Sequence, residues 1–170
     1  MARRSFALLV LVACTSILFA VGIPFSAPQN SLAPYVPTPQ PVVDKMLELA
    51  QVTSKDVLYD LGCGDGIILD DQESRELLAE NGDYLGVDVS SELLEKARGR
   101  HHEKNVSFLQ GNLSDNDLVQ KIISRNNMWD CIISVFVIQE IPDIESFVIN
   151  LKQLLDFVSV AIIVTVISSP

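Results

Sequence analysis

The sequence predicts an α/β fold built on a doubly wound, mostly parallel sheet. Short apolar runs of strand type alternate five times with segments of helix type, and this alternation is typical of parallel sheets that carry helices on both faces. The run 130–138 is apolar at nearly every position, as expected of a central strand covered on both sides. The chain has 170 residues, of which 48% are hydrophobic, so it can form one such domain with a buried core.

Each element has its own signal. Helices are predicted where apolar residues recur at helical spacing, and strands where short apolar runs enter glycine or polar turns. Ser90 is a favourable N-cap for one helix, and Gly82 stands where another should end. The predicted helices are 42–51, 73–81, 90–100, 118–124 and 144–155. The predicted strands are 56–61, 84–89, 106–110, 130–138 and 158–166.

Residues 1–22 differ from the rest of the chain. Arg3 and Arg4 precede a run of 18 uncharged residues, 5–22, which predicts a signal peptide or a signal anchor. An uncleaved anchor, a cleaved signal and a lipoprotein signal at Cys14 stay open as alternatives. We therefore expect a protein that is membrane-associated through this N-terminal run or exported after cleavage.

A proline-rich segment separates this region from the domain. Residues 23–41 contain prolines at short intervals, and proline fixes φ and removes backbone donors. We therefore expect 23–41 to be an extended linker and the folded domain to cover 42–170.

Charge and composition exclude several classes of function. With 22 acidic and 12 basic residues the net charge is −10, so no basic face is expected that could bind nucleic acid. Three scattered cysteines and two adjacent histidines predict neither a disulfide framework nor a metal site. Cys63 and Cys131 are expected to be small buried residues, and His101 and His102 to lie on the surface at a helix end.

The loop after the first predicted strand of the domain carries the clearest chemical signal. It reads DLGCGDG over residues 60–66, and glycine at alternate positions lets the backbone turn sharply and approach a ligand closely. A second acid, Asp88, ends the next strand, where a carboxylate can bind ribose hydroxyls. Ligands of such sheets bind at the carboxyl ends of the strands, so the pair of loops predicts a nucleoside-containing ligand.

Charge discriminates among the nucleoside ligands. A phosphate-binding P-loop needs Gly-Lys-Ser/Thr after the glycines, and a dinucleotide loop needs Gly-x-Gly-x-x-Gly, whereas this loop is Gly-x-Gly-x-Gly flanked by Asp60 and Asp65. Two carboxylates would repel a pyrophosphate but attract a sulfonium and an α-amino group. The pattern therefore favours S-adenosylmethionine.

Four segments together resemble the class I S-adenosylmethionine-dependent methyltransferases. They are VLYDLGCGDG (57–66), YLGVDVS (84–90), FLQGNL (108–113) and WDCIISVFVIQEIPD (129–143). The resemblance extends from about residue 42 to 166. Residues 34–52 are similar, less specifically, to the lead-in of small members of the family that are N-terminally anchored or exported.

The resemblance implies a Rossmann-like methyltransferase sheet and a cofactor site at its edge. Asp60 would hold the amino group of the cofactor, Asp88 its ribose, and Val89 and Asn112 its adenine. The full set of implied cofactor-binding residues is Asp60, Gly62, Cys63, Gly64, Asp65, Gly66, Asp88, Val89, Asn112, Leu113 and Ser134. It assigns no catalytic residue, and the methyl acceptor stays open between a small molecule and a protein lysine.

The sequence also departs from the family pattern. Residues 67–74 are interrupted by acids where the family has an apolar helix, and Asn112 replaces an acid. The family adds two strands beyond the position of Pro170, so we expect a C-terminally incomplete sheet with one edge uncovered. These departures motivate an alternative function: a catalytically silent, membrane-tethered module with a degenerate methyltransferase fold.

Overall fold

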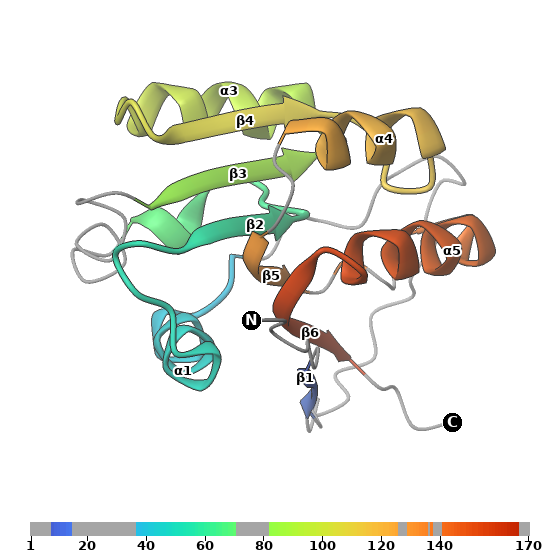
Figure 1. The fold of residues 1–170 in the computed structure, drawn as a ribbon. Coiled ribbons are helices and arrows are strands. Elements are labelled where there is room, and N and C mark those ends of the chain that lie inside the picture. Colours follow the sequence, from blue (N-terminus) through green and yellow to red (C-terminus); the bar gives the residue numbers. More distant parts are fainter. Residues whose placement is uncertain are drawn as a thin grey trace, which may run out of the picture.

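The computed structural model describes residues 8–14, 37–70, 82–125, 129–135, 137 and 141–166. Within these residues one sheet of parallel strands is flanked by helices (Figure 1). The strands are β1 (Leu8–Cys14), β2 (Val57–Leu61), β3 (Asp83–Asp88), β4 (Val106–Gln110), β5 (Trp129–Val135) and β6 (Val158–Val166). The helices are α1 (Gln40–Ala50), α3 (Ser91–Arg100), α4 (Asn116–Arg125) and α5 (Ile144–Leu155), with a 3₁₀ turn η1 (Ile67–Leu69).

The strand order confirms the predicted doubly wound sheet. The described strands lie in the order β1-β6-β5-β2-β3-β4, and all five neighbouring pairs are parallel. From β2 the chain runs outward through β3 and β4, and it then returns to the other side of β2 with β5 and β6. The point of reversal lies between β2 and β5, where Asp60 pairs with Ile133. Ligands of such sheets bind at the carboxyl ends of the strands at this point.

Apolar side chains cover both faces of the sheet, as the continuous apolar strands predicted. α1 and η1 cover one face, and α4 and α5 cover the other (Figure 1). α3 packs against β3 and β4 through the buried Leu94 and Ala97. The first core layer includes Val43, Met46, Leu58, Tyr84, Cys131 and Ile162. The second includes Tyr59, Leu85, Ile122, Trp129, Ile132 and Phe147.

Several element boundaries differ from those predicted by one to three residues, and two of these differences concern the linker and the surroundings of the glycine loop. α1 begins at Gln40, inside the predicted linker, because Pro41 lies in its first turn, where a missing N–H costs no hydrogen bond. β5 ends at Val135, short of the predicted 138. The apolar run continues past the strand because Val137 packs against Gly62 of the glycine loop. The predicted helix 73–81 lies outside the described residues.

The sheet edge at β6, which the sequence predicted to be uncovered, is paired in the structure, and β1 becomes the edge strand instead. β1 pairs in parallel with the outer edge of β6, from Leu8 opposite Val160 to Cys14 opposite Val166. β1 falls inside the predicted signal or anchor, because an apolar run of seven residues satisfies both a strand and a signal pattern. In the part of the chain that the structure describes, no helix is both long and apolar enough to span a bilayer.

Candidate cofactor site

The glycine loop forms a tight turn directly after β2. Gly62, Gly64 and Gly66 have φ values of 87°, 55° and 80°, in the left-handed region that residues with a Cβ rarely adopt. The amides of Gly62 and Cys63 both donate to the carbonyl oxygen of Val87, over 2.7 and 3.1 Å. The loop is therefore bound to the end of β3, and the predicted sharp turn is confirmed.

Close packing also requires glycine in this loop. A Cβ on Gly62 would overlap the side chain of Val137, which follows β5. A Cβ on Gly66 would lie 3.2 Å from the imidazole of His101 and 3.3 Å from the Cβ of Ala97, both from the end of α3. The loop is thus enclosed between the segment after β5 and the C-terminal turn of α3.

Asp88 meets the glycine loop at the end of β3. Its Oδ2 accepts a hydrogen bond from the Gly64 amide at 2.8 Å, and its Oδ1 accepts one from the Ser90 amide at 2.8 Å. A carboxylate has about four lone-pair sites, so acceptor capacity remains for two hydroxyls. Val89 beside it is 50% exposed and presents an apolar surface on which a base could stack. The structure therefore brings Asp88, Val89 and Gly64 together as predicted.

Asp60 lies beneath this surface instead of on it. Its side chain is buried, and its Oδ2 accepts a hydrogen bond of 2.7 Å from the hydroxyl of Tyr84. Burial raises the pKa of Asp60 to about 7; the hydrogen bond from Tyr84 opposes this shift and the nearby charge of Asp88 adds to it. Asp60 is therefore placed to support the loop from below. Its carboxyl group changes between the protonated and the ionised form near neutral pH.

Tyr84 is a residue that the sequence analysis missed as part of the site. It belongs to the strand next to Asp60, two positions before Gly86, which pairs with Asp60. Side chains two apart on a strand share one face, so Tyr84 and Asp60 meet on the α1 side of the sheet. Only the strand register reveals this, because register decides which residues of neighbouring strands are adjacent.

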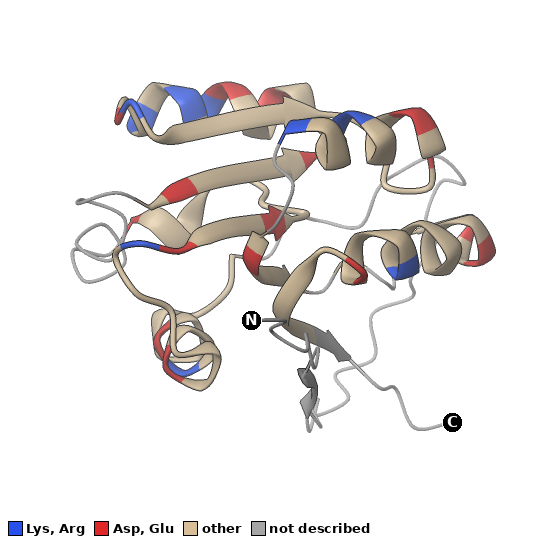
Figure 2. Ribbon diagram, in the orientation of Figure 1, with Lys and Arg blue, Asp and Glu red and all other residues tan. Residues whose placement is uncertain are grey.

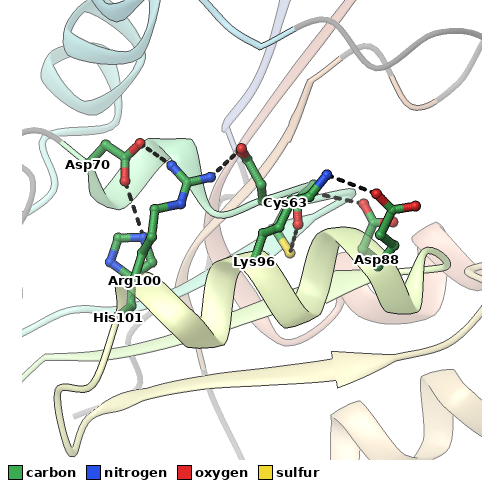
Figure 3. A network of polar contacts seen from close by, with 9 residues as sticks. Cys63, Asp70, Asp88, Lys96, Arg100 and His101 are labelled. Carbon is green, nitrogen blue, oxygen red and sulfur yellow. Dashed lines mark hydrogen bonds and ion pairs between the residues drawn. The ribbon is translucent and has the colours of Figure 1, made fainter.

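Asp65 and His101 are placed differently from the expectation. The carboxylate of Asp65 forms an ion pair with the guanidinium of Arg100 (Figure 3), so its charge is compensated within the protein. His101 is 7% exposed, and the prediction of a surface histidine is wrong. The imidazole fits beneath the loop because Gly66 has no side chain, and its ring lies 6.3 Å from that of Phe108.

The remaining predicted residues lie in three settings. The exposed Asn112 uses its Oδ1 to accept from the Ser114 amide at 2.9 Å, in a local turn. Leu113 is buried, and its carbonyl accepts from Asn150. Ser134 is 1% exposed, and its hydroxyl has no hydrogen-bond partner among the described residues. Since Ser134 follows Ile133, the partner of Asp60 at the switch point, an unsatisfied hydroxyl there points to a bound ligand or water.

Cys63 and Cys131 are buried, as predicted. Burial raises the pKa of the Cys63 thiol well above its usual range, and the carboxylates of Asp60 and Asp88 add to this shift. Burial likewise raises the pKa of Cys131 to about 12. Both thiols are therefore protonated at neutral pH and poor nucleophiles. Cys63 contributes packing: a Cβ on Gly86 would lie 2.7 Å from its sulfur.

Comparison with known proteins identifies the family. A family model described as a methyltransferase domain matches residues 59–156. Over 94 residues the chain is 34% identical to a protein-lysine N-methyltransferase from Saccharolobus islandicus, covering 53% of this chain and 56% of the relative. Over 127 residues it is 24% identical to a ubiquinone biosynthesis O-methyltransferase from Rickettsia canadensis, covering 74% of this chain and 49% of the relative. The chain thus spans about half the length of these curated relatives.

Solved structures agree on the fold. An RNA methyltransferase from Salinibacter ruber, in complex with S-adenosyl-L-homocysteine, is 32% identical with a TM-score of 0.50, over 73% of this chain and 72% of that one. A methyltransferase from Aquifex aeolicus that depends on S-adenosylmethionine has 20% identity and a TM-score of 0.50, over 66% of this chain and 57% of that one. At 20% identity, the second comparison shows the fold alone.

The sheet order and the glycine loop define a Rossmann-like methyltransferase domain, whose cofactor is S-adenosylmethionine. The chain belongs to the methyltransferase-domain family. The residues present fit that cofactor: Asp88 keeps free acceptor capacity, Val89 is an exposed apolar surface, and Ser134 offers an unpaired hydroxyl.

Proposed function

We propose that this chain binds S-adenosylmethionine at the carboxyl ends of β2 and β3 and transfers its methyl group to a protein lysine. The observation that carries the proposal is the contact between Asp88 and Gly64, because it joins the ribose-binding acid to the glycine turn in one surface. Figure 2 shows acidic residues at the ends of β2 and β3. Of these, Asp88 meets the glycine loop, whereas Asp60 is buried beneath it. The negative charge of Asp88 favours a cofactor that carries a sulfonium and an amino group.

Charge supports a lysine as the acceptor. The chain carries 22 acidic and 12 basic residues, and a negative surface attracts cationic substrates while it repels phosphates. A protein-lysine methyltransferase is 34% identical to about half of the chain. The same charge argues against RNA, although the Salinibacter ruber relative is an RNA methyltransferase.

Positioning accounts for the chemistry that the described residues can perform. The cofactor would supply an electrophilic methyl group on its sulfonium, which a deprotonated lysine amine can attack in line, with the thioether S-adenosylhomocysteine as the leaving group. Asp88, held by the Gly64 amide, would bind the ribose, and the hydroxyl of Ser134 would be available as a hydrogen-bond donor. Holding the nucleophile about 3 Å from the methyl carbon supplies most of the acceleration in such a reaction.

A transfer assay tests the proposal. The full chain is incubated with S-adenosylmethionine labelled on its methyl group and with lysine-rich peptide, RNA or a small phenolic acceptor, and Asp88→Ala serves as the matched control. We expect label as methyl-lysine in the peptide, with little in the control. Label in RNA or the phenol would contradict the acceptor class. Cofactor binding without any transfer would favour a silent module, and absence of binding would overturn the proposal.

For the location of the protein, we propose membrane attachment through residues 5–22. The support is the uncharged run behind two arginines. Residues paired in a sheet cannot cross a bilayer at the same time, so the pairing of β1 with β6 and membrane insertion are alternative states of this segment. Alkaline extraction of membranes tests the proposal: the full chain should stay in the pellet and a chain without residues 1–22 should not.

A further inference from the structure

Asp70, the first of the acids that interrupt the sequence after the glycine loop, has a structural partner. Asp70 directly follows η1, and its Oδ2 lies 2.5 Å from a guanidinium nitrogen of Arg100. The other terminal nitrogen of the same guanidinium contacts Asp65 in the glycine loop. Figure 3 shows Arg100 reaching from the last turn of α3 to carboxylates on both of its sides. One side chain therefore links Asp65 and Asp70.

The same helix end also packs beneath the loop. His101 and Ala97 lie so close to Gly66 that only a glycine fits without displacement. Nε2 of His101 lies 3.4 Å from Oδ1 of Asp70, on the same carboxylate that Arg100 holds. Shape and charge thus fix the loop and η1 against one turn of α3.

We propose that Arg100 is a positioning residue for cofactor binding, which clamps the glycine loop through Asp65 and Asp70. The proposal rests on the proposed function in that the loop must bind S-adenosylmethionine. It assigns Asp65 to the clamp instead of to the cofactor. It also gives a structural role to Asp70, one of the acids in residues 67–74, which forms an ion pair directly after η1.

Arginine suits this role because its planar fork presents donors in two directions, whereas a lysine ammonium acts as a point charge. The side chains of Arg100, Asp65 and Asp70 are 37%, 17% and 35% exposed. Solvent screens such pairs in part, so each contributes modestly. We therefore expect a clamp that sets the position of the loop without dominating the stability of the fold.

The experiment compares Arg100→Gln, Arg100→Lys and Asp65→Asn with the control Lys96→Gln. Lys96 forms an exposed ion pair with Glu92 on the same helix and does not take part in the clamp. Calorimetry measures Kd for S-adenosylmethionine and, separately, for S-adenosylhomocysteine, which lacks the sulfonium charge. Hydrogen exchange of the ligand-free protein follows the amides of Gly62, Cys63, Gly64, Gly66, Leu69 and Asp70, all of which are hydrogen-bonded.

For Arg100→Gln we expect about fivefold weaker binding of both compounds and faster exchange of these amides. Arg100→Lys should lose less of this affinity. Adding Asp65→Asn to Arg100→Gln should weaken binding little further, because the effects of substitutions within one network are not additive. Lys96→Gln should match the wild type.

Unchanged Kd and unchanged exchange in Arg100→Gln would overturn the proposal. So would an effect on S-adenosylmethionine alone, because it would show that the charge of Arg100 acts on the sulfonium and not on the loop. If the wild type binds neither compound, the proposed function fails, and the exchange measurement still decides whether Arg100 clamps the loop.

Discussion

At the scale of single residues, the site depends on two acids in different environments. Asp88 is half-buried at a strand end and binds two backbone amides. Asp60 is buried under the same loop with one tyrosine partner. The environment therefore separates their roles: Asp88 can meet a ligand, whereas Asp60 supports the loop and responds to pH.

Replacing Asp88 with alanine should weaken cofactor binding by about 1.5–3 kcal/mol, since charge-assisted hydrogen bonds to the ribose are lost. The ligand-free protein should also lose about 1 kcal/mol of stability, because the Gly64 and Ser90 amides lose their acceptor. Calorimetry and urea unfolding measure the two effects. Asp88→Asn keeps one acceptor oxygen, so it should lose less cofactor affinity and less stability than Asp88→Ala. A stability loss with intact binding would leave Asp88 a purely structural role.

The raised pKa of Asp60 predicts a specific pH dependence. The pKa of Asp60 is about 7 in the folded protein, against 3.8 for an ordinary aspartate, as in the unfolded chain. Between these two pH values the folded state therefore binds a proton that the unfolded state has lost. Stability from this group is thus fully present below about pH 4 and is lost as pH rises through 7. Relative to Asp60→Asn, the wild type should lose on the order of 3 kcal/mol between pH 4 and 8. Urea unfolding at several pH values measures this, and parallel curves for the two proteins would disprove it.

At the scale of elements, the loop between β2 and η1 sets the geometry of the site. Three glycines with positive φ let it turn back onto β3, while Val137 after β5 and the end of α3 leave no room for side chains at two of them. The constraint is therefore both conformational and steric, and the neighbouring elements supply the steric part.

Gly62→Ala should destabilise the fold by roughly 2–3 kcal/mol, since its methyl group would overlap Val137 at a φ that alanine rarely adopts. Gly99 is the matched control: it lies in α3 with open space around its Cβ position. Gly99→Ala should instead stabilise by up to about 0.5–1 kcal/mol. Thermal unfolding measures whether each variant lowers or raises the melting temperature. Equal shifts in the melting temperature of the two variants would contradict the steric and conformational role of Gly62.

At the scale of the whole molecule, β1 is an edge strand of the described sheet. It runs along the outer edge of β6 and pairs its backbone groups. Open edges invite pairing with other chains. The N-terminal segment therefore determines which strand presents this edge: β1 when the segment lies in the sheet, and β6 when it does not.

A chain starting at residue 37 should keep the sheet from β2 to β6, because side chains of these strands and of α1, α4 and α5 form the two core layers described above. It should self-associate more strongly than the full chain, because β6 would present an open edge of nine residues where β1 presents seven. Circular dichroism checks the fold, and analytical ultracentrifugation checks the association. A truncated chain that stays monomeric at high concentration would show that β1 is not needed as a cover.

The sequence by itself determined the α/β class, the glycine turn and the acid at the end of β3. These features are local: apolar periodicity predicts strands and helices, and alternate glycines predict a sharp turn. The structure confirms them at Gly62, Gly64 and Asp88. They could be predicted because each depends on residues close together in the chain.

The tertiary structure alone decided which distant residues complete the site. Tyr84 lies 24 residues from Asp60, Arg100 lies 30 from Asp70, and Leu8 pairs with Val160. Strand register and helix docking create these contacts, and neither leaves a local pattern in the sequence. The same reason accounts for the buried His101, which the sequence placed on the surface. His101 is buried at the end of α3 because Gly66, from the glycine loop, packs against its ring.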